Sequence, residues 1–347
     1  MTVPPFCMAK ITVPPGTRAS IDLPAGYLYT HTPLSIPVHV VHGRKQGPCL
    51  VVSAAVHGDE INGVEIIRRM LRLPALRRLS GTLVAVPVVN VLGFVGRSRY
   101  LPDRRDLNRC FPGNDRGSVA ARLAWLFRTE VLSRASHVVD LHTAAIHRDN
   151  LPQIRADLDD AGAEALARAF GVPVVIHSPI PDGSLRSAAR NLEVPAVTFE
   201  GGEALRFDES AIRAGLRGLQ RVMRHLGMLA ASRSGRKPAE SQYIADSSSW
   251  VRASQDGILR AVVALGDRVR RGQPLGWISD PFGDREAVVA ANAPGLVIGR
   301  TNLPLVHQGE ALFHIARFDQ VGRVYRDMAR YSEALENEED WPEPPIV

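Results

Sequence analysis

Three apolar runs of the β type in this chain each end in a short polar segment, and this repeated arrangement constrains the fold most. The segments are His57–Glu60 (HGDE), Asp140–Thr143 (DLHT) and Phe199–Glu203 (FEGGE). In an open α/β sheet, side chains at the carboxyl ends of neighbouring strands converge on one crevice even when they lie far apart in the sequence. The pattern therefore predicts an α/β domain whose sheet edge holds two histidines and two glutamates.

Helical periodicity alternates with such apolar runs over the first two thirds of the chain. Helices are predicted at residues 61–71, 119–132 and 161–170, and a longer one from about 208 to 226 that Gly227 ends. Strands are predicted at residues 48–56, 81–90, 136–141, 172–176 and 195–199. Residues 1–45 show short β pieces broken by proline and glycine, which predicts a β-rich lead-in or sheet edge.

A polar stretch at residues 231–241 (ASRSGRKPAES) marks the predicted domain boundary. Helical periodicity disappears after it, and short β runs separated by Gly, Pro and Asp continue to about residue 316. We therefore predict a catalytic α/β domain over residues 1–235, with the lead-in at 1–45, and a small all-β module over 242–316. Residues 317–347 are predicted to form a C-terminal tail with an acidic, Pro-rich end.

Composition excludes several classes of protein. The 42 basic and 36 acidic residues are spread along the 347-residue chain, without the basic stripe of a nucleic-acid binder. Cys7, Cys49 and Cys110 have no disulfide or metal-ligand spacing, which favours a reducing compartment and predicts the cytoplasm. No apolar run indicates a signal peptide or a membrane span. We expect no nucleic-acid or membrane partner, and homo-oligomerisation is left open.

His57 and Glu60 are the first candidate metal ligands, since a His-x-x-Glu pair with a distant third histidine is a recurrent zinc site. The same spacing recurs at His307–Glu310, but in a predicted hairpin of the β module rather than at a strand end. Alone, His142 reads as a buried, satisfied imidazole; beside the strand-end pair it becomes the third candidate ligand. Asp140 is a candidate to orient it. Such a ligand set would accept Fe²⁺, Co²⁺ or Mn²⁺ as well as Zn²⁺.

The order of motifs resembles the succinylglutamate desuccinylase/aspartoacylase family. The matching segments are His57–Glu60, Asp106–Arg109 (DLNR), Asp140–Thr143 and the strand-end Glu200, and the resemblance covers about residues 45–316. It implies a carboxypeptidase-like α/β fold, a mixed sheet with helices on both faces. It also implies amide hydrolysis by metal-activated water, with one Zn²⁺ per chain held by His57, Glu60 and His142.

The resemblance further implies roles for residues around the metal. Glu200 corresponds to the carboxylate that moves the proton, and its place directly after a strand favours it over Glu203, which lies beyond two glycines. Arg99 or Arg109 could supply a cation that stabilises charge on the reacting oxygen, and Arg99, in the Arg99-Tyr100 pair, resembles the family's residue for this role. Asn108 and Arg109 resemble its anchor for a substrate carboxylate.

The C-terminal module resembles a lipoyl/biotinyl-type barrel-sandwich domain at residues 265–275 and 293–297. A carrier role requires a lysine for attachment, and no lysine follows Lys237, so we expect the module to wall the substrate entrance instead.

We therefore predict a zinc-dependent amidohydrolase that removes an acyl group from an N-acyl amino acid or a related small, carboxylate-bearing amide. Two alternatives stay open. One is a carboxypeptidase-like exopeptidase acting on short peptides, and the other is a non-catalytic, metal-binding protein of the same fold.

Overall fold

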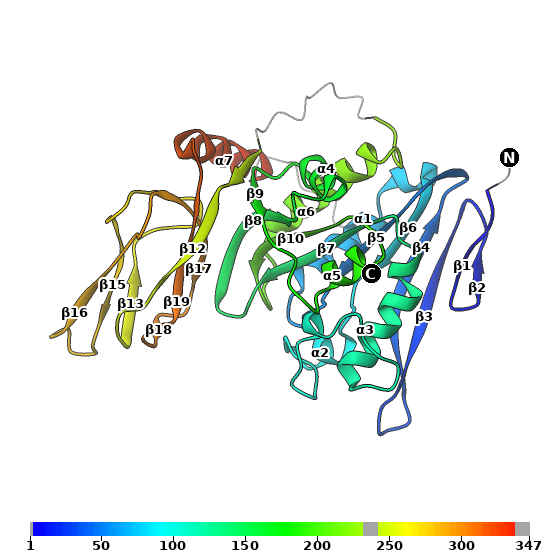
Figure 1. Cartoon of the computed structure of the whole chain (residues 1–347), viewed down its shortest axis with the longest axis horizontal. Helices are drawn as coiled ribbons and strands as arrows, with labels where there is room; N and C mark the ends of the chain where they lie inside the picture. The colour runs from blue at the N-terminus through cyan, green and yellow to red at the C-terminus, as the bar shows by residue number, and fades with distance from the viewer. Residues whose placement is uncertain (1–2, 232–241, 337–347) are drawn as a thin grey trace.

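The apolar runs form the middle of one large mixed sheet (Figure 1). In the computed structural model, which describes residues 3–231 and 242–336, thirteen strands belong to this sheet. Its central strands β5 (Lys45–Ala54), β7 (His137–Ala144) and β10 (Ala196–Glu203) run parallel, with β7 in the middle. Parallel strands covered on both faces are apolar along most of their length, which is why these runs stand out in the sequence.

Further strands extend the sheet on both sides. β6 (Ser80–Val86) is parallel to β5, and β4 (Pro33–His42) and β3 (Thr17–Tyr27) follow as antiparallel strands. The predicted lead-in thus supplies an edge of the sheet, together with a separate hairpin of β1 (Phe6–Met8) and β2 (Ile11–Val13). On the other side, β8 (Arg148–Ala156) is antiparallel to β10, and β9 (Val174–His177) and β11 (Tyr243–Ala245) continue from β8.

Helices cover both faces of the sheet, as predicted. On one face, α1 (Asn62–Leu71), α4 (Ala161–Phe170) and α6 (Glu209–His225) pack on apolar side chains such as Leu141 and Phe199. On the other, α3 (Val119–Glu130) and α5 (Leu185–Arg190) pack on Val51 and Val138. Short helical segments are α2 (Val91–Val95), η1 (Pro74–Arg78), η2 (Leu107–Arg109) and η3 (Leu132–Arg134). Within the described ranges, no helix combines the length and apolar character needed to cross a membrane.

The C-terminal module consists of two packed sheets. β12 (Ser247–Arg252), β14 (Arg268–Val269), β17 (Gly295–Thr301) and β19 (Ala311–Arg317) continue the large sheet, because β17 pairs with β8. β13 (Gly257–Ala261), β15 (Pro274–Ser279), β16 (Glu286–Ala290) and β18 (Leu305–Val306) form the second sheet. A core that includes Leu275, Ile278 and Phe313 joins the two. The likeness to a lipoyl-type domain stays a prediction.

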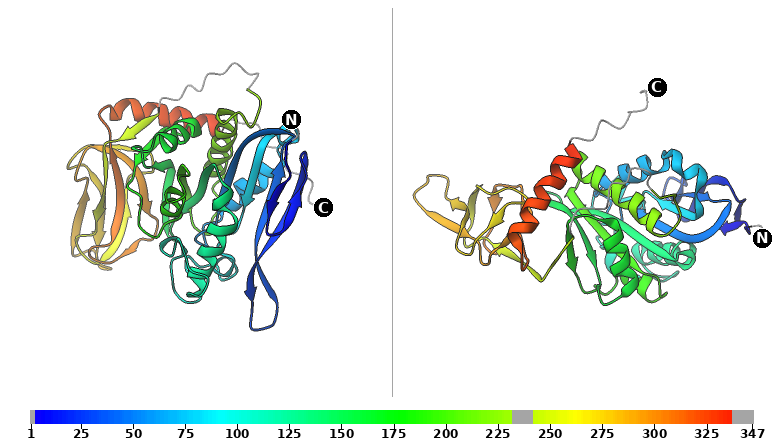
Figure 2. Two further views of the ribbon diagram at one scale, coloured as in Figure 1. Left: turned by 45° about the vertical axis from the view of Figure 1, so that its right-hand side comes forward. Right: turned by 90° about the horizontal axis from the view of Figure 1, so that it is seen from above.

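Part of the segment predicted as a tail is helical. Residues Val321–Glu336 form α7, and its Val324, Met328 and Tyr331 are buried in the same core as α6. Figure 2 shows α7 beside α6, and the β module extending to one side of the α/β part. The linker at 232–241 and the acidic end at 337–347 lie outside the described residues. The predicted domain limits stay a prediction.

Candidate functional site

The polar segments meet at the carboxyl ends of the central strands. β5 leads into the turn that carries His57 and Glu60 before α1, while His142 lies in β7 and Glu200 in β10. Glu200 and His142 are paired positions of neighbouring parallel strands, so their side chains share one face of the sheet. This is the face that α3 and α5 cover.

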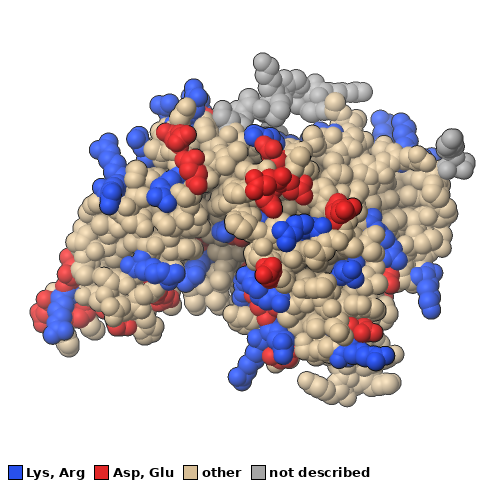
Figure 3. Space-filling view, viewed as in Figure 1, with Lys and Arg blue, Asp and Glu red and all other residues tan. Residues whose placement is uncertain are grey.

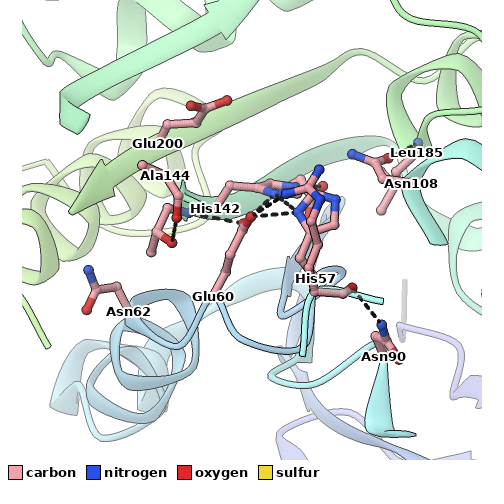
Figure 4. Close-up of polar contacts among 12 residues, drawn as sticks. His57, Glu60, Asn62, Asn90, Asn108, His142, Ala144, Leu185 and Glu200 are labelled. Atoms are coloured by element: carbon pink, nitrogen blue, oxygen red, sulfur yellow. Dashed lines mark hydrogen bonds and ion pairs between the residues drawn. The ribbon is translucent and has the colours of Figure 1, made fainter. Parts of the chain in front are cut away.

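His57, Glu60 and His142 form one buried cluster (Figure 4). The Nδ1 atom of His57 lies 2.7 Å from Glu60 Oε1, and the Nδ1 atom of His142 lies 2.8 Å from Glu60 Oε2. The two Nδ1 atoms are 3.2 Å apart. At most 5% of any of the three residues is exposed. The structure therefore brings together the three residues that the sequence singled out as ligands.

The outer nitrogen of each imidazole faces a carboxylate. His57 Nε2 lies 3.1 Å from Asp106 Oδ1, and His142 Nε2 lies 2.6 Å from Asp140 Oδ2. Ser53 Oγ donates to the other oxygen of Asp140. A carboxylate that accepts the Nε2–H proton fixes the tautomer in which Nδ1 keeps its lone pair. Two lone pairs and the Glu60 carboxylate then point at one position, which is a donor set for a cation.

The charges around the cluster fit a divalent ion. The Arg99 guanidinium pairs with Glu60 Oε1 at 3.1 Å and with Asp106 Oδ2 at 3.0 Å. With both imidazoles neutral, the carboxylates of Glu60, Asp106 and Asp140 exceed this one guanidinium by two negative charges. Uncompensated buried charge is costly, so a single divalent cation among nitrogen and oxygen ligands would balance the site.

The pKa values of the cluster also reflect this need for positive charge. Burial alone would raise the pKa of Glu60, but the charges of His57 and His142 outweigh it and hold that pKa below its usual range. Burial lowers the pKa of His142, yet the charges of Asp140 and Glu60 raise it well above the usual value. The carboxylates thus draw positive charge into the cluster.

A pocket of about 270 Å³ opens beside the cluster. Trp250, from β12, lies in its wall, so the β module lines part of the pocket, as expected for a module that walls the entrance. Figure 3 shows a recess between the module and the α/β part, with basic side chains on both of its sides. Pocket residues with polar or aromatic side chains include Arg99, Asn108, Arg109, Arg148, Asn150, Arg155, Arg186, Glu200 and Trp250.

The two candidate glutamates lie in different surroundings. Glu200 lines the pocket, with Oε1 2.9 Å from Arg155 Nε and Oε2 accepting a 2.7 Å hydrogen bond from Asn150 Nδ2. Glu203 instead accepts hydrogen bonds from the His147 backbone N–H and from Asn302 Nδ2. Glu203 is not among the pocket residues of the described chain, so the geometry favours Glu200.

The Asp106–Arg109 segment joins the cluster to the pocket. Asn108 Oδ1 accepts a 2.8 Å hydrogen bond from the Leu185 N–H, which ties the segment to the start of α5. Arg109 is exposed and donates to the Asn108 carbonyl at 2.7 Å, and no carboxylate of the described residues pairs with it. Burial would lower the pKa of Arg99, but the charges of Glu60 and Asp106 raise it.

The sequence pattern alone did not identify several residues of the site. Asp106 opens the DLNR motif, but its bond to His57 cannot be inferred from the spacing of the two residues. Asn150 and Arg155 lie in β8, which was not predicted because Pro152 and a β-bulge break its alternation. Trp250 comes from the module across the boundary, where no sequence signal links it to the site.

Comparison with known proteins gives a consistent result. A model of the succinylglutamate desuccinylase/aspartoacylase catalytic domain matches residues 46–226. The N-alpha-acetyl-L-2,4-diaminobutyric acid deacetylase of Halomonas elongata is 28% identical over 295 residues, which are 81% of this chain and 85% of that protein.

Solved structures match nearly the whole fold. A succinylglutamate desuccinylase/aspartoacylase from Rhodobacter sphaeroides superposes with a TM-score of 0.77 at 25% identity, over 87% of this chain and 96% of that one. The product-bound ectoine utilization protein EutE (DoeB) from Ruegeria pomeroyi has a TM-score of 0.77 at 24% identity, over 87% and 95%, and shows a common fold.

Proposed function

The chain is an enzyme of the succinylglutamate desuccinylase/aspartoacylase family, and we propose that it hydrolyses the amide bond of a small N-acyl amino acid with the help of one bound Zn²⁺. The observation that carries this proposal is the convergence of His57 Nδ1, His142 Nδ1 and the Glu60 carboxylate, with both outer ring nitrogens against carboxylates. Three protein ligands with one open position are the usual composition of a catalytic zinc site.

His57, Glu60 and His142 would hold the ion, and Asp106 and Asp140 would keep the two rings oriented. When bound, Zn²⁺ supplies a Lewis acid that acidifies water and polarises a carbonyl group. Arg99 contributes a second positive charge at the edge of the cluster. Its guanidinium has five N–H donors, of which Glu60 and Asp106 engage two, so further N–H groups remain for an oxygen that becomes negative during the reaction.

Glu200 acts as the proton carrier in this proposal. Its carboxylate accepts a proton from the attacking water and delivers it to the nitrogen of the leaving amine. The Arg155 contact balances the charge of the carboxylate before the reaction. Glu200 stands one strand away from His142 on the same face of the sheet, which supports this role.

Asn108 and Arg109 are proposed to bind the carboxylate of the substrate. The Arg109 guanidinium lines the pocket and has no carboxylate partner among the described residues, which leaves its planar donors for a substrate. The pocket volume of about 270 Å³ is small beside the about 300–1,000 Å³ of pockets for drug-sized ligands. An N-acyl amino acid, like the acetylated diamino acid named for the Halomonas relative, suits this volume better than a long peptide.

Metal analysis paired with a substrate panel tests the proposal. The panel holds N-succinylglutamate, Nα-acetyl-2,4-diaminobutyrate, other N-acetylated amino acids and blocked dipeptides. We expect one zinc per chain and hydrolysis of one or more N-acyl amino acids that a chelator abolishes and added zinc restores. Faster cleavage of the dipeptides would assign an exopeptidase, and hydrolysis that persists after complete metal removal would overturn the proposal.

A further inference from the structure

Strand β8 contains a β-bulge beside Glu200. Along the antiparallel pair of β8 and β10, Glu200 pairs with Gln153, whereas Gly202 pairs with Asn150. The stretch from Glu200 to Gly202 in β10 therefore lies opposite the stretch from Gln153 to Asn150 in β8, which is one residue longer. This extra residue lies at or beside Pro152, and a bulge tolerates a proline because the ladder of hydrogen bonds is interrupted there. Because paired positions share a face, the bulge turns the Asn150 side chain to the side of the sheet on which Glu200 lies.

Asn150 supplies the directional contact to the Glu200 carboxylate. Its Nδ2 donates to Glu200 Oε2 at 2.7 Å, and no other hydrogen bond from the described residues reaches this carboxylate. Arg155 Nε lies 2.9 Å from Oε1, but its buried N–H group makes no aligned hydrogen bond. Arg155 therefore supplies charge, whereas Asn150 fixes the rotation of the carboxylate.

The β module provides the space that Asn150 occupies. Gly299 of β17 pairs with Asn150 on one side and with His314 of β19 on the other. A Cβ atom at Gly299 would lie 2.7 Å from Asn150 Oδ1 and 3.3 Å from His314 Cβ. The first distance is shorter than real contacts, so an alanine at this position would push the Asn150 amide aside.

From this geometry we propose that Asn150 is a positioning residue for Glu200, and that the absence of a side chain at Gly299 leaves the space for the Asn150 amide. The β module thereby acts on the proton-transfer step, in addition to lining the pocket through Trp250. Asn150 holds one carboxylate oxygen, so that the free lone pairs of Glu200 keep a fixed direction toward the substrate. This inference rests on the proposed role of Glu200.

Measuring kcat and KM of zinc-loaded Asn150 variants tests the inference. The substrate is the member of the panel that the wild type hydrolyses fastest. We expect N150A to lower kcat by about 10- to 100-fold while KM stays within about threefold, because proton transfer rather than binding is impaired. N150D keeps the shape of the side chain but replaces the donor with a like charge. It is expected to lower kcat further and to shift the acid limb of the pH profile of kcat to higher pH.

A double mutant separates the positioning role of Gly299 from a structural one. G299A alone is expected to lower kcat by about 3- to 30-fold, and N150A/G299A is expected to match N150A, since the alanine then has no amide to displace. Multiplicative losses would overturn the role of Gly299. If G299A fails to fold, the N150A and N150D pair still decides the role of Asn150.

Asn302 offers a matched control in the same junction. Its Nδ2 donates to Glu203 Oε2 at 3.0 Å, the same kind of bond to the glutamate outside the pocket. N302A is expected to keep kcat within about twofold of the wild type. Wild-type kcat and pH profiles in both N150A and N150D would overturn the inference. If E200Q also keeps the wild-type rate, the proposed role of Glu200 fails; if only E200Q loses it, the inference alone fails.

Discussion

The sheet edge and the β module each carry a His-x-x-Glu pair and a further histidine, yet the two pairs lie in different surroundings. At the sheet edge, His57, Glu60 and His142 are buried and lie within bonding distance of one another. In the module, the His307 side chain is 90% exposed and pairs with Asp256, whose side chain is 70% exposed. Glu310 accepts from the His307 backbone N–H, and His314 is buried in the neighbouring strand.

This difference shows that topology, rather than spacing, makes a ligand set. Parallel strands β5 and β7 end at the same edge, so the turn after one strand meets the last residues of the other. In the module, the same His-x-x-Glu spacing falls on the turn that connects β18 to β19. These two strands belong to different sheets, so the turn is not the predicted hairpin, and the His307 side chain faces solvent. Among the described residues, the module's pair has no third ligand within reach.

Removing one glutamate from each region is expected to give the largest difference between them. E60A is expected to lose the bound zinc and at least about a thousandfold in kcat/KM, because the two imidazoles alone hold the ion weakly and the Lewis acid is lost with it. E310A is expected to change neither zinc content nor rate. Metal content and initial rates, measured side by side, check both outcomes.

E60Q controls for folding, since glutamine keeps the volume of the buried side chain. If E60A or E60Q kept one zinc per chain and hydrolysed the substrate at the wild-type rate, the cluster would not be the metal site. The proposed difference between the two regions would then be wrong.

The two glutamates after β10 give the second largest contrast. E200Q is expected to lower kcat by about 10²- to 10⁴-fold with zinc retained, because a glutamine cannot carry the proton. E203Q replaces a carboxylate that bonds His147 and Asn302 at the module junction, and we expect its rate to stay within about twofold of the wild type. Equal losses in the two variants would contradict the assignment.

Much of the central fold could be predicted from the sequence, because buried parallel strands leave long apolar runs. The segments that became β5, β7, β10, α4 and α6 were all expected, with ends shifted by a few residues. α6 begins close to the predicted start at residue 208, where the Asp208 side chain caps the helix by accepting from the Ala211 N–H. The three candidate ligands were found because His57 and His142 directly follow such runs and Glu60 stands three residues after His57.

The residues that contact the candidate site residues from other segments were harder to find. Asp106 lies 49 residues from its partner His57, and Asn150 lies 50 residues from its partner Glu200. β8 combines charged residues, Pro152 and a bulge, so it lacks a readable period of two. α7 lies in the segment predicted as a tail, although its buried Val324, Met328 and Tyr331 follow a helical period. The sequence does not show that this face packs beside α6.

The carboxylates that contact the histidines also differ between the two regions. D140N is expected to weaken zinc affinity by about 10- to 100-fold, because an amide holds the His142 ring less firmly and makes its Nδ1 less basic. D256N removes the partner of His307 and is expected to leave zinc affinity unchanged. Competition with a chelating dye measures both affinities. An affinity of D140N equal to that of the wild type would show that Asp140 does not support a ligand.

His314 is as buried as His142 but lies in the opposite electrostatic setting. Its ring stacks on Trp250 at a centroid distance of 4.6 Å, and its Nδ1 has no hydrogen-bond partner among the described residues. Burial, together with the charge of Arg155, lowers the pKa of His314 to about 3. No carboxylate compensates for the lost hydration here, whereas Asp140 and Glu60 raise the pKa of His142. His314 is therefore neutral in the folded protein.

The smallest expected effect follows from that neutral ring. Because the folded pKa of His314 is below its usual value of 6.5, the unfolded chain binds the proton first, and stability falls as the pH decreases from 6.5 towards 3. Between pH 7 and pH 5 this loss amounts to about 2 kcal/mol.

H314F keeps a ring against Trp250 but cannot titrate, so its free energy of unfolding in urea should decrease by correspondingly less over this interval. H307F, at the exposed position, should follow the wild type. Equal pH dependence in H314F and the wild type would mean that the buried ring of the module is protonated at no cost, and the electrostatic contrast between the two regions would fail.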